Sequence, residues 1–202
     1  MELLTRVSEG LDLVITKIGK IAAWAGLALI LVTIFDVVTR RFFVLGSTKL
    51  QELEWHFHVV LFALCLGYAY LKDSHVRIDL VRENLNKRTQ WWIELAGCLL
   101  FLLPYCALVV YFGIDFTQRS FDNSEISASA TGLSHRWIIK SMIPIGFSLL
   151  GLSAFAIVLR KIVELFGPED LRAKVHEIEE AEAEHLDDVV PPELRKHDEE
   201  PR

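Results

Sequence analysis

Apolar residues along the chain gather in four long runs that are separated by short charged segments. The runs cover residues 21–38, 55–71, 95–114 and 141–159. The first contains one charged residue, Asp36, and the other three contain no Asp, Glu, Lys or Arg. Helices of these lengths measure about 25–30 Å, which is close to the hydrocarbon thickness of a bilayer. The pattern predicts an all-α membrane protein with four transmembrane helices.

The single charge in the first run does not prevent that run from inserting. Asp36 lies near the end of the run, where a carboxylate costs less than at mid-membrane. Ten Leu, Ile, Val and Phe residues contribute about −4 kcal/mol on the insertion scale, against about +3 kcal/mol for a central Asp. A soluble bundle would show polar faces at helical spacing, and the runs do not. The tryptophans lie at or near the run boundaries, as interfacial anchors do: Trp24, Trp55, Trp91, Trp92 and Trp137.

The segments that flank the transmembrane domain, residues 21–166, differ in character. Residues 1–20 carry apolar positions three and four apart, which predicts an N-terminal amphipathic helix. This helix either lies at the membrane surface or extends the first span. Residues 167–202 hold 13 acids and 5 bases, whereas the rest of the chain carries a net charge of +2. The sequence therefore predicts an acidic tail that is partly disordered from Asp187 onward.

Lysine and arginine are distributed unevenly between the two sides of the predicted bundle. Twelve lie in the N-terminal segment, in the loop of residues 72–94 and in the first part of the tail, and six lie in the other two loops. This bias predicts that both termini are cytoplasmic. The body has no basic stripe that would indicate nucleic-acid binding, and too little chain lies outside the runs to build the core of an aqueous enzyme.

Charged residues near the non-cytoplasmic ends of the first three spans are candidates for function. Asp36 and Arg40 have the spacing of a helical ion pair, and five more charged residues lie on the same side: Arg41, Glu52, Glu54, Asp115 and Arg119. These seven residues either anchor the helices at the interface or form a docking rim for a soluble partner. Three cysteines lie inside the runs without metal-ligand spacing and are interpreted as packing residues: Cys65, Cys98 and Cys106. No metal site or cofactor is expected.

The middle of each span lacks ionisable residues, which pumps and ion-coupled carriers need at that depth. A small drug exporter would need a carboxylate near mid-span, and Asp36 lies too close to an end. Small residues instead offer helix-packing faces, Ala22 with Gly26 and Ala63 with Gly67. The chain is therefore expected to support another membrane protein.

Three segments carry a resemblance to a known family. They are residues 51–55 (QELEW), residues 67–79 (GYAYLKDSHVRID) and residues 131–137 (TGLSHRW), the last leading to Pro144-Ile145-Gly146. Together they resemble the small membrane subunit of tripartite ATP-independent periplasmic (TRAP) transporters, the DctQ-like proteins. The resemblance covers roughly residues 15–165. Ser134 departs from it, since the family pattern has a proline there.

The resemblance implies a permease subunit and not an enzyme. In this family a large membrane subunit carries the substrate and sodium sites, and a periplasmic binding protein delivers an organic acid. The small subunit would then be a scaffold in the bacterial or archaeal cytoplasmic membrane. It implies capping or subunit contact for His75, Arg77 and Asp79. Contact with the large subunit or the binding protein is implied for Glu52 and Glu54, and a role in fixing the start of the fourth span for Arg136 and Trp137.

An alternative from another class is the membrane-anchor subunit of a respiratory oxidoreductase, with haem b. Such a site needs two axial histidines at matching depth on neighbouring helices. His56 and His58 lie two positions apart on one predicted span and point to nearly opposite sides. No other span contains a histidine that would pair with them.

Overall fold

The computed structural model describes residues 1–43, 46–72 and 85–187, and in these ranges the fold is all-helical. The helices are α1 (Glu2–Phe42), α2 (Thr48–Leu71), α4 (Lys87–Gly97), α5 (Leu103–Asp122), α6 (Trp137–Phe166) and α7 (Glu169–Asp187). A single π-helical turn, η1 (Cys98–Leu102), joins α4 to α5 without a break. The predicted all-α class is confirmed for the described part of the chain.

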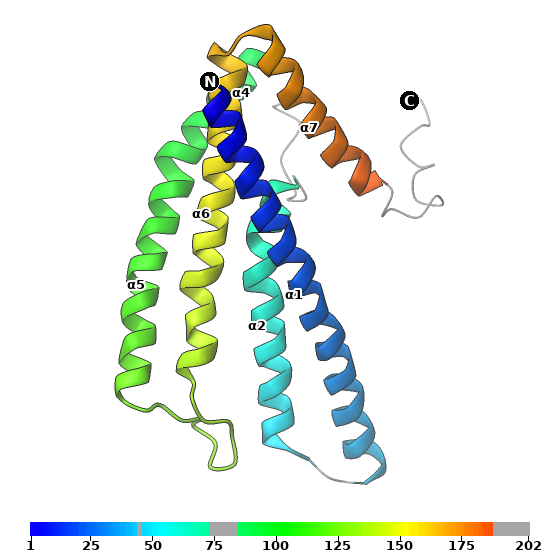
Figure 1. Cartoon of the computed structure of the whole chain (residues 1–202). Helices are drawn as coiled ribbons and strands as arrows, with labels where there is room; N and C mark the ends of the chain where they lie inside the picture. The colour runs from blue at the N-terminus through cyan, green and yellow to red at the C-terminus, as the bar shows by residue number, and fades with distance from the viewer. Residues whose placement is uncertain (44–45, 73–84, 188–202) are drawn as a thin grey trace.

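Four long helical segments run side by side, and α6 lies between α5 and α2 (Figure 1). Helix α1 packs along the other side of α2 and also contacts α6 near its own N-terminus. The N-terminus and the junction of α6 with α7 lie at one end of the molecule, which we call the terminal end. The end of α1, the start of α2 and the loop of residues 123–136 lie at the opposite end, which we call the loop end.

Helix α1 is one continuous element of 41 residues. At 1.5 Å per residue it is about 60 Å long, roughly twice the hydrocarbon thickness of a bilayer. The boundary that we predicted at residue 20 falls inside this helix, since no proline interrupts it. Residues 2–20 and the first apolar run thus form one helix.

The third apolar run contains Pro104, for which the sequence predicts a kink. Proline has no N–H for a bond to the preceding turn, and its ring crowds the carbonyl four residues earlier. The wider π-helical turn of Cys98–Leu102 lies immediately before this point, and Pro104 occupies the first turn of α5. The helix thus accommodates the proline without ending.

Small residues bring α2 and α6 into backbone contact. A Cβ added at Gly67 would lie 2.8 Å from the Leu149 carbonyl, and one at Gly146 would lie 2.8 Å from the Ala63 carbonyl oxygen. The Ser153 hydroxyl donates to the Gly67 carbonyl at 2.8 Å across the same contact. The predicted packing role of Ala63 and Gly67 is therefore confirmed, because only small residues permit this approach.

Helix α1 meets α2 through the same kind of surface. A Cβ at Gly19 would lie 2.6 Å from the Tyr68 ring, and one at Gly26 would lie 3.5 Å from the Leu61 side chain. Ala22, between them, is 1% exposed. The predicted packing face formed by Ala22 and Gly26 is confirmed, and Gly19 extends it by one turn toward the terminal end.

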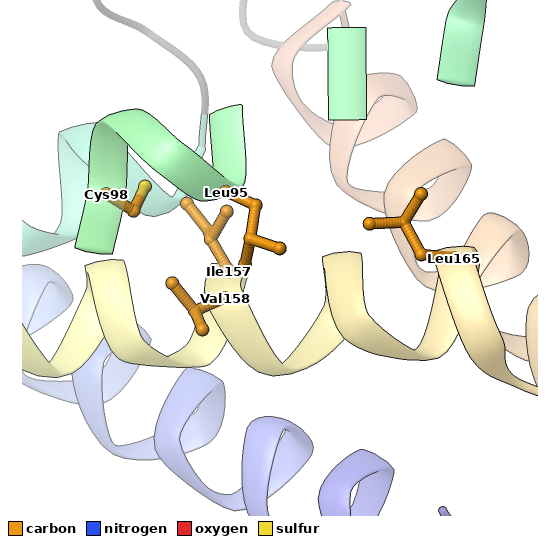
Figure 2. Packing of buried hydrophobic residues seen from close by; sticks show 5 residues of the cluster. All are labelled: Leu95, Cys98, Ile157, Val158 and Leu165. Carbon is orange, nitrogen blue, oxygen red and sulfur yellow. The ribbon is translucent and has the colours of Figure 1, made fainter. Parts of the chain in front are cut away.

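The terminal half of α6 is covered by α4 and η1. Figure 2 shows Leu95 and Cys98 beside Ile157 and Val158 of α6, with Leu165 farther along the same helix, and these five residues belong to one apolar cluster. The interpretation of Cys98 as a packing residue is confirmed, and the Tyr70 hydroxyl lies 3.1 Å from its sulfur.

The outer faces of this assembly are apolar and exposed. In α6, 56% of the most apolar stretch is buried, against 11% in α1 and 17% in the segment of residues 87–122. These three are, among the described helices, the ones long and apolar enough to cross a membrane. Helix α2 does not join them, because its first half contains several polar residues: Lys49, Gln51, Glu52, Glu54, His56 and His58. By composition, the described residues thus give three of the four predicted spans.

Candidate functional site

At the loop end, the last turns of α1 and the first turns of α2 enclose an open cavity of about 600 Å³, which we call the rim pocket. Its lining residues are Thr33, Asp36, Val37, Arg40, Arg41, Gln51, Glu54 and Trp55. The end of α1 and the start of α2 lie side by side at this end, which brings the two sets of side chains together (Figure 1). Four of the seven predicted rim residues meet here, whereas Asp115 and Arg119 pair with each other on α5.

Asp36 organises one side of the rim pocket. Only 3% of this residue is exposed, and its Oδ2 accepts a hydrogen bond from the Arg40 guanidinium one turn later. The predicted ion pair between these two residues is confirmed. With its amide oxygen turned toward Arg40, Gln51 accepts from the same guanidinium at 3.0 and 2.9 Å. Arg40 therefore ties α1 to α2 as well as neutralising Asp36.

Three groups that line the rim pocket have no hydrogen-bond partner among the described residues. They are Asp36 Oδ1 and Glu54 Oε1, both buried, and the exposed guanidinium of Arg41. A buried carboxylate oxygen without a donor carries an uncompensated desolvation cost. The pocket is thus built to accept donors at the two carboxylates and to offer donors at Arg41.

Glu52 lies on a different side of α2 and does not join the rim pocket. Its carboxylate accepts hydrogen bonds from the Ser127 hydroxyl and from the Leu133 backbone N–H, the latter at 2.6 Å. The Leu133 hydrogen bond, followed by that of Ser127, lowers the pKa of the Glu52 carboxyl. Glu52 therefore holds the loop of residues 123–136 within this chain.

A second carboxylate, that of Glu125, attaches the loop of residues 123–136 to α6. Glu125 pairs with Lys140 on the first turn of α6, and the hydrogen bond from Lys140 lowers the pKa of Glu125. The Arg136 N–H donates to the Glu125 carbonyl at 3.2 Å, immediately before α6 begins at Trp137. The Trp137 ring packs edge-on against Phe121, with ring centroids 5.3 Å apart. Arg136 and Trp137 thus lie where α6 starts, as the resemblance implied.

His75, Arg77 and Asp79 lie in residues 73–84, outside the described residues, so their role in subunit contact stays a prediction. Within the described ranges, no group of three or more His, Cys, Asp and Glu side chains is arranged to hold a metal ion. His56 and His58 both lie on α2, and the His56 ring contacts the Glu52 carbonyl oxygen one turn earlier.

Sequence reasoning missed a buried ionic cluster at the terminal end. Arg160 of α6 is 4% exposed, pairs with Asp12 of α1 and donates from Nε to the Ser8 hydroxyl at 3.2 Å. One residue further, Lys161 pairs with the buried Glu164 at 3.0 Å. A local signal existed, because Ser8 and Asp12 are polar positions one turn apart on an amphipathic helix. The predicted fourth run ends at residue 159, so Arg160 and Lys161 lie just beyond it.

The part of the chain from the last half of α1 to the end of α6 matches a known protein family. No curated protein matches the chain. A family model described as tripartite ATP-independent periplasmic transporters, DctQ component, matches residues 29–165. The matched range contains the rim pocket, the loop of residues 123–136 and the contact between α2 and α6. The chain therefore belongs to the DctQ family, the small membrane component of TRAP transporters.

Proposed function

We propose that this chain is the small permease subunit of a sodium-driven, binding-protein-dependent transporter for an organic acid, in which it acts as a scaffold for the large subunit. The observation that carries the proposal is the backbone contact between α2 and α6, inside the range matched by the family. Helices in such close contact are poorly suited to sliding, because interfaces of this kind have one packed arrangement. A fixed group of helices is what a moving transport subunit needs beside it.

The positions of the charged residues favour a scaffold role for this chain over the role of an independent carrier. Ion-coupled carriers place ionisable groups or broken helices at mid-membrane. Here the charged pairs of the described residues lie toward the two ends, with Asp36–Arg40 at the loop end and Asp12–Arg160 at the terminal end. The oxidoreductase-anchor alternative has no support in the family match.

The proposed topology has four crossings of the cytoplasmic membrane, formed by α1, α2, the segment of residues 87–122 and α6. Both termini are then cytoplasmic and the loop end faces the periplasm. The distribution of lysine and arginine supports this orientation. The exposed apolar faces of α1 and α5 are the surfaces available to the large subunit and to lipid, and the loop of residues 123–136, with Arg136 at its end, faces the incoming binding protein.

Reconstitution tests the proposal directly. Proteoliposomes that contain this chain together with its large TRAP subunit, with the binding protein added outside, are expected to accumulate the organic acid when a sodium gradient is imposed. Vesicles with this chain alone are expected to accumulate none. Accumulation by this chain alone, or undiminished uptake by the large subunit without it, would contradict the scaffold role.

A further inference from the structure

The rim pocket carries unsatisfied groups of both signs. Asp36 Oδ1 and Glu54 Oε1 are buried acceptors without a donor, and Arg41 is a donor to which no described residue supplies an acceptor. Arg40 does not relieve them, because it is held by Asp36 Oδ2 and Gln51. A ligand that satisfied all three groups would bring N–H donors to one side of the pocket and acceptor oxygens to the other.

The sum of the charges narrows the class of ligand. Two carboxylates, Asp36 and Glu54, face two guanidinium groups, Arg40 and Arg41, so the lining is neutral. A cation or an anion alone would leave the filled pocket charged at the edge of a low-dielectric layer, where an uncompensated charge is costly. A zwitterion keeps the filled pocket neutral. Its cation reaches the unpartnered carboxylate oxygens, and its anion reaches the Arg41 guanidinium.

The depth of the pocket indicates where that zwitterion comes from. Its walls are the end of the first apolar run and the start of the second, which is headgroup depth for a chain that crosses the bilayer. Trp55 lines it with 70% of its surface exposed, in the position of an interfacial anchor. Val37 adds an apolar surface to the lining.

We propose that the rim pocket binds the headgroup of phosphatidylethanolamine from the surrounding leaflet, with the ammonium at Asp36 and Glu54 and the phosphate at Arg41. A primary ammonium offers three N–H donors to the two orphan carboxylate oxygens. Phosphatidylcholine has no N–H to give, and its quaternary ammonium prefers a cage of several aromatic rings, of which the pocket has one. Phosphatidylglycerol has no cation for the carboxylates. This inference goes beyond the scaffold proposal and does not depend on it.

Native mass spectrometry of the full-length chain tests the proposal. The protein is extracted from nanodiscs that contain phosphatidylethanolamine, phosphatidylcholine and phosphatidylglycerol in equal parts, and the retained lipids are counted. We expect one phosphatidylethanolamine to be retained preferentially. Glu54→Gln and Arg41→Gln each remove one contact while leaving the Asp36–Arg40 pair in place, and each is expected to weaken retention about tenfold. Asp36→Asn is expected to weaken it at least as much.

A matched control lies at the same end of the molecule. Asp115 and Arg119 on α5 form an exposed pair with the same helical spacing as Asp36 and Arg40, but they line no part of the rim pocket. Asp115→Asn should leave lipid retention unchanged. Soluble phosphoethanolamine, added at millimolar concentration, should displace little of the lipid if the acyl chains also contribute. Equal retention of all three lipids, or loss of phosphatidylethanolamine in Asp115→Asn to the same extent as in Glu54→Gln, would overturn the proposal.

Discussion

Gly67 lies where α2 comes closest to α6, so its lack of a side chain has a measurable consequence. In Gly67→Val, the added carbon would meet the Leu149 carbonyl at 2.8 Å and the Ser153 hydroxyl at 2.9 Å. The helices must separate, and the Ser153 hydrogen bond to the Gly67 carbonyl is lost. We expect a destabilisation of about 1–3 kcal/mol, measured as a lower midpoint of thermal unfolding in detergent.

Gly97 provides the control for this substitution. It also lies in a helix, but a Cβ there meets nothing within 4 Å. Gly97→Ala should leave the unfolding midpoint unchanged or raise it, since alanine favours the helix by about 0.5–1 kcal/mol. If both variants shifted the midpoint equally, the close contact of α2 with α6 would not be a determinant of stability.

Glu52 makes the loop of residues 123–136 sensitive to acid. Its folded-state pKa is lowered, chiefly by the Leu133 N–H, so the ionised carboxylate is the form that the loop stabilises. This contribution is fully present above the ordinary carboxyl pKa and is lost as the pH falls through the lowered folded value. We expect hydrogen-exchange protection of the Leu133 amide to fall on acidification below about pH 4.5, relative to amides in α6.

Because the pKa of Glu125 is lowered as well, one substitution should not abolish this pH dependence. Glu52→Gln should reduce the protection of Leu133 already at neutral pH and leave a residual acid response from Glu125. The double variant with Glu125→Gln should show none. An unchanged acid response in the double variant would mean that other groups control the loop.

The extension of α1 is held to α6 by a buried ion pair, and this contact decides whether the first twenty residues dock. Asp12→Ala removes the carboxylate that faces the buried Arg160. Leaving a buried guanidinium without this partner should cost about 3–5 kcal/mol. Glu9→Gln, which loses the partly exposed pair with Lys174, should cost less than about 1 kcal/mol. Urea unfolding monitored by tryptophan fluorescence distinguishes the two, and equal losses would argue against a buried cluster.

The spacing of residues along the sequence predicted the features that depend on residues close together in the chain. The Asp36–Arg40 pair and the small faces of α1 and α2 follow from positions three and four residues apart. The end of α6 at Phe166 follows locally as well, because Gly167 and Pro168 come directly after it. The partner of Arg160 does not, since Asp12 lies 148 positions earlier in the chain. No local pattern encodes such a partner.

Glu52 and Glu54 show that sequence-based prediction has the same limit for the direction of single side chains. Glu52 and Glu54 were predicted to act together, yet residues two apart on a helix point about 200° apart. The helical period alone would have separated them. That Glu52 receives the Leu133 N–H could not be predicted, because it depends on the path of the loop of residues 123–136.

Across the whole molecule, the position of α2 bears on the number of membrane crossings. Helix α2 lies between α1 and α6, with backbone contact on the side of α6, so two of its sides are covered by other helices (Figure 1). A helix in this position does not need the hydropathy of an isolated span. Composition by itself therefore undercounts the crossings that we propose, and the position of α2 in the bundle supports a fourth.

Cysteine labelling tests that fourth crossing. In a variant with Cys65, Cys98 and Cys106 replaced by alanine, single cysteines are placed at the exposed positions Lys49, Ala130 and Glu177. An impermeant maleimide added to intact spheroplasts should label positions 49 and 130, and should label position 177 only after permeabilisation. Positions 49 and 130 are separated by α2 and by the segment of residues 87–122. If α2 did not cross, they would lie on opposite sides and only one would be labelled from outside.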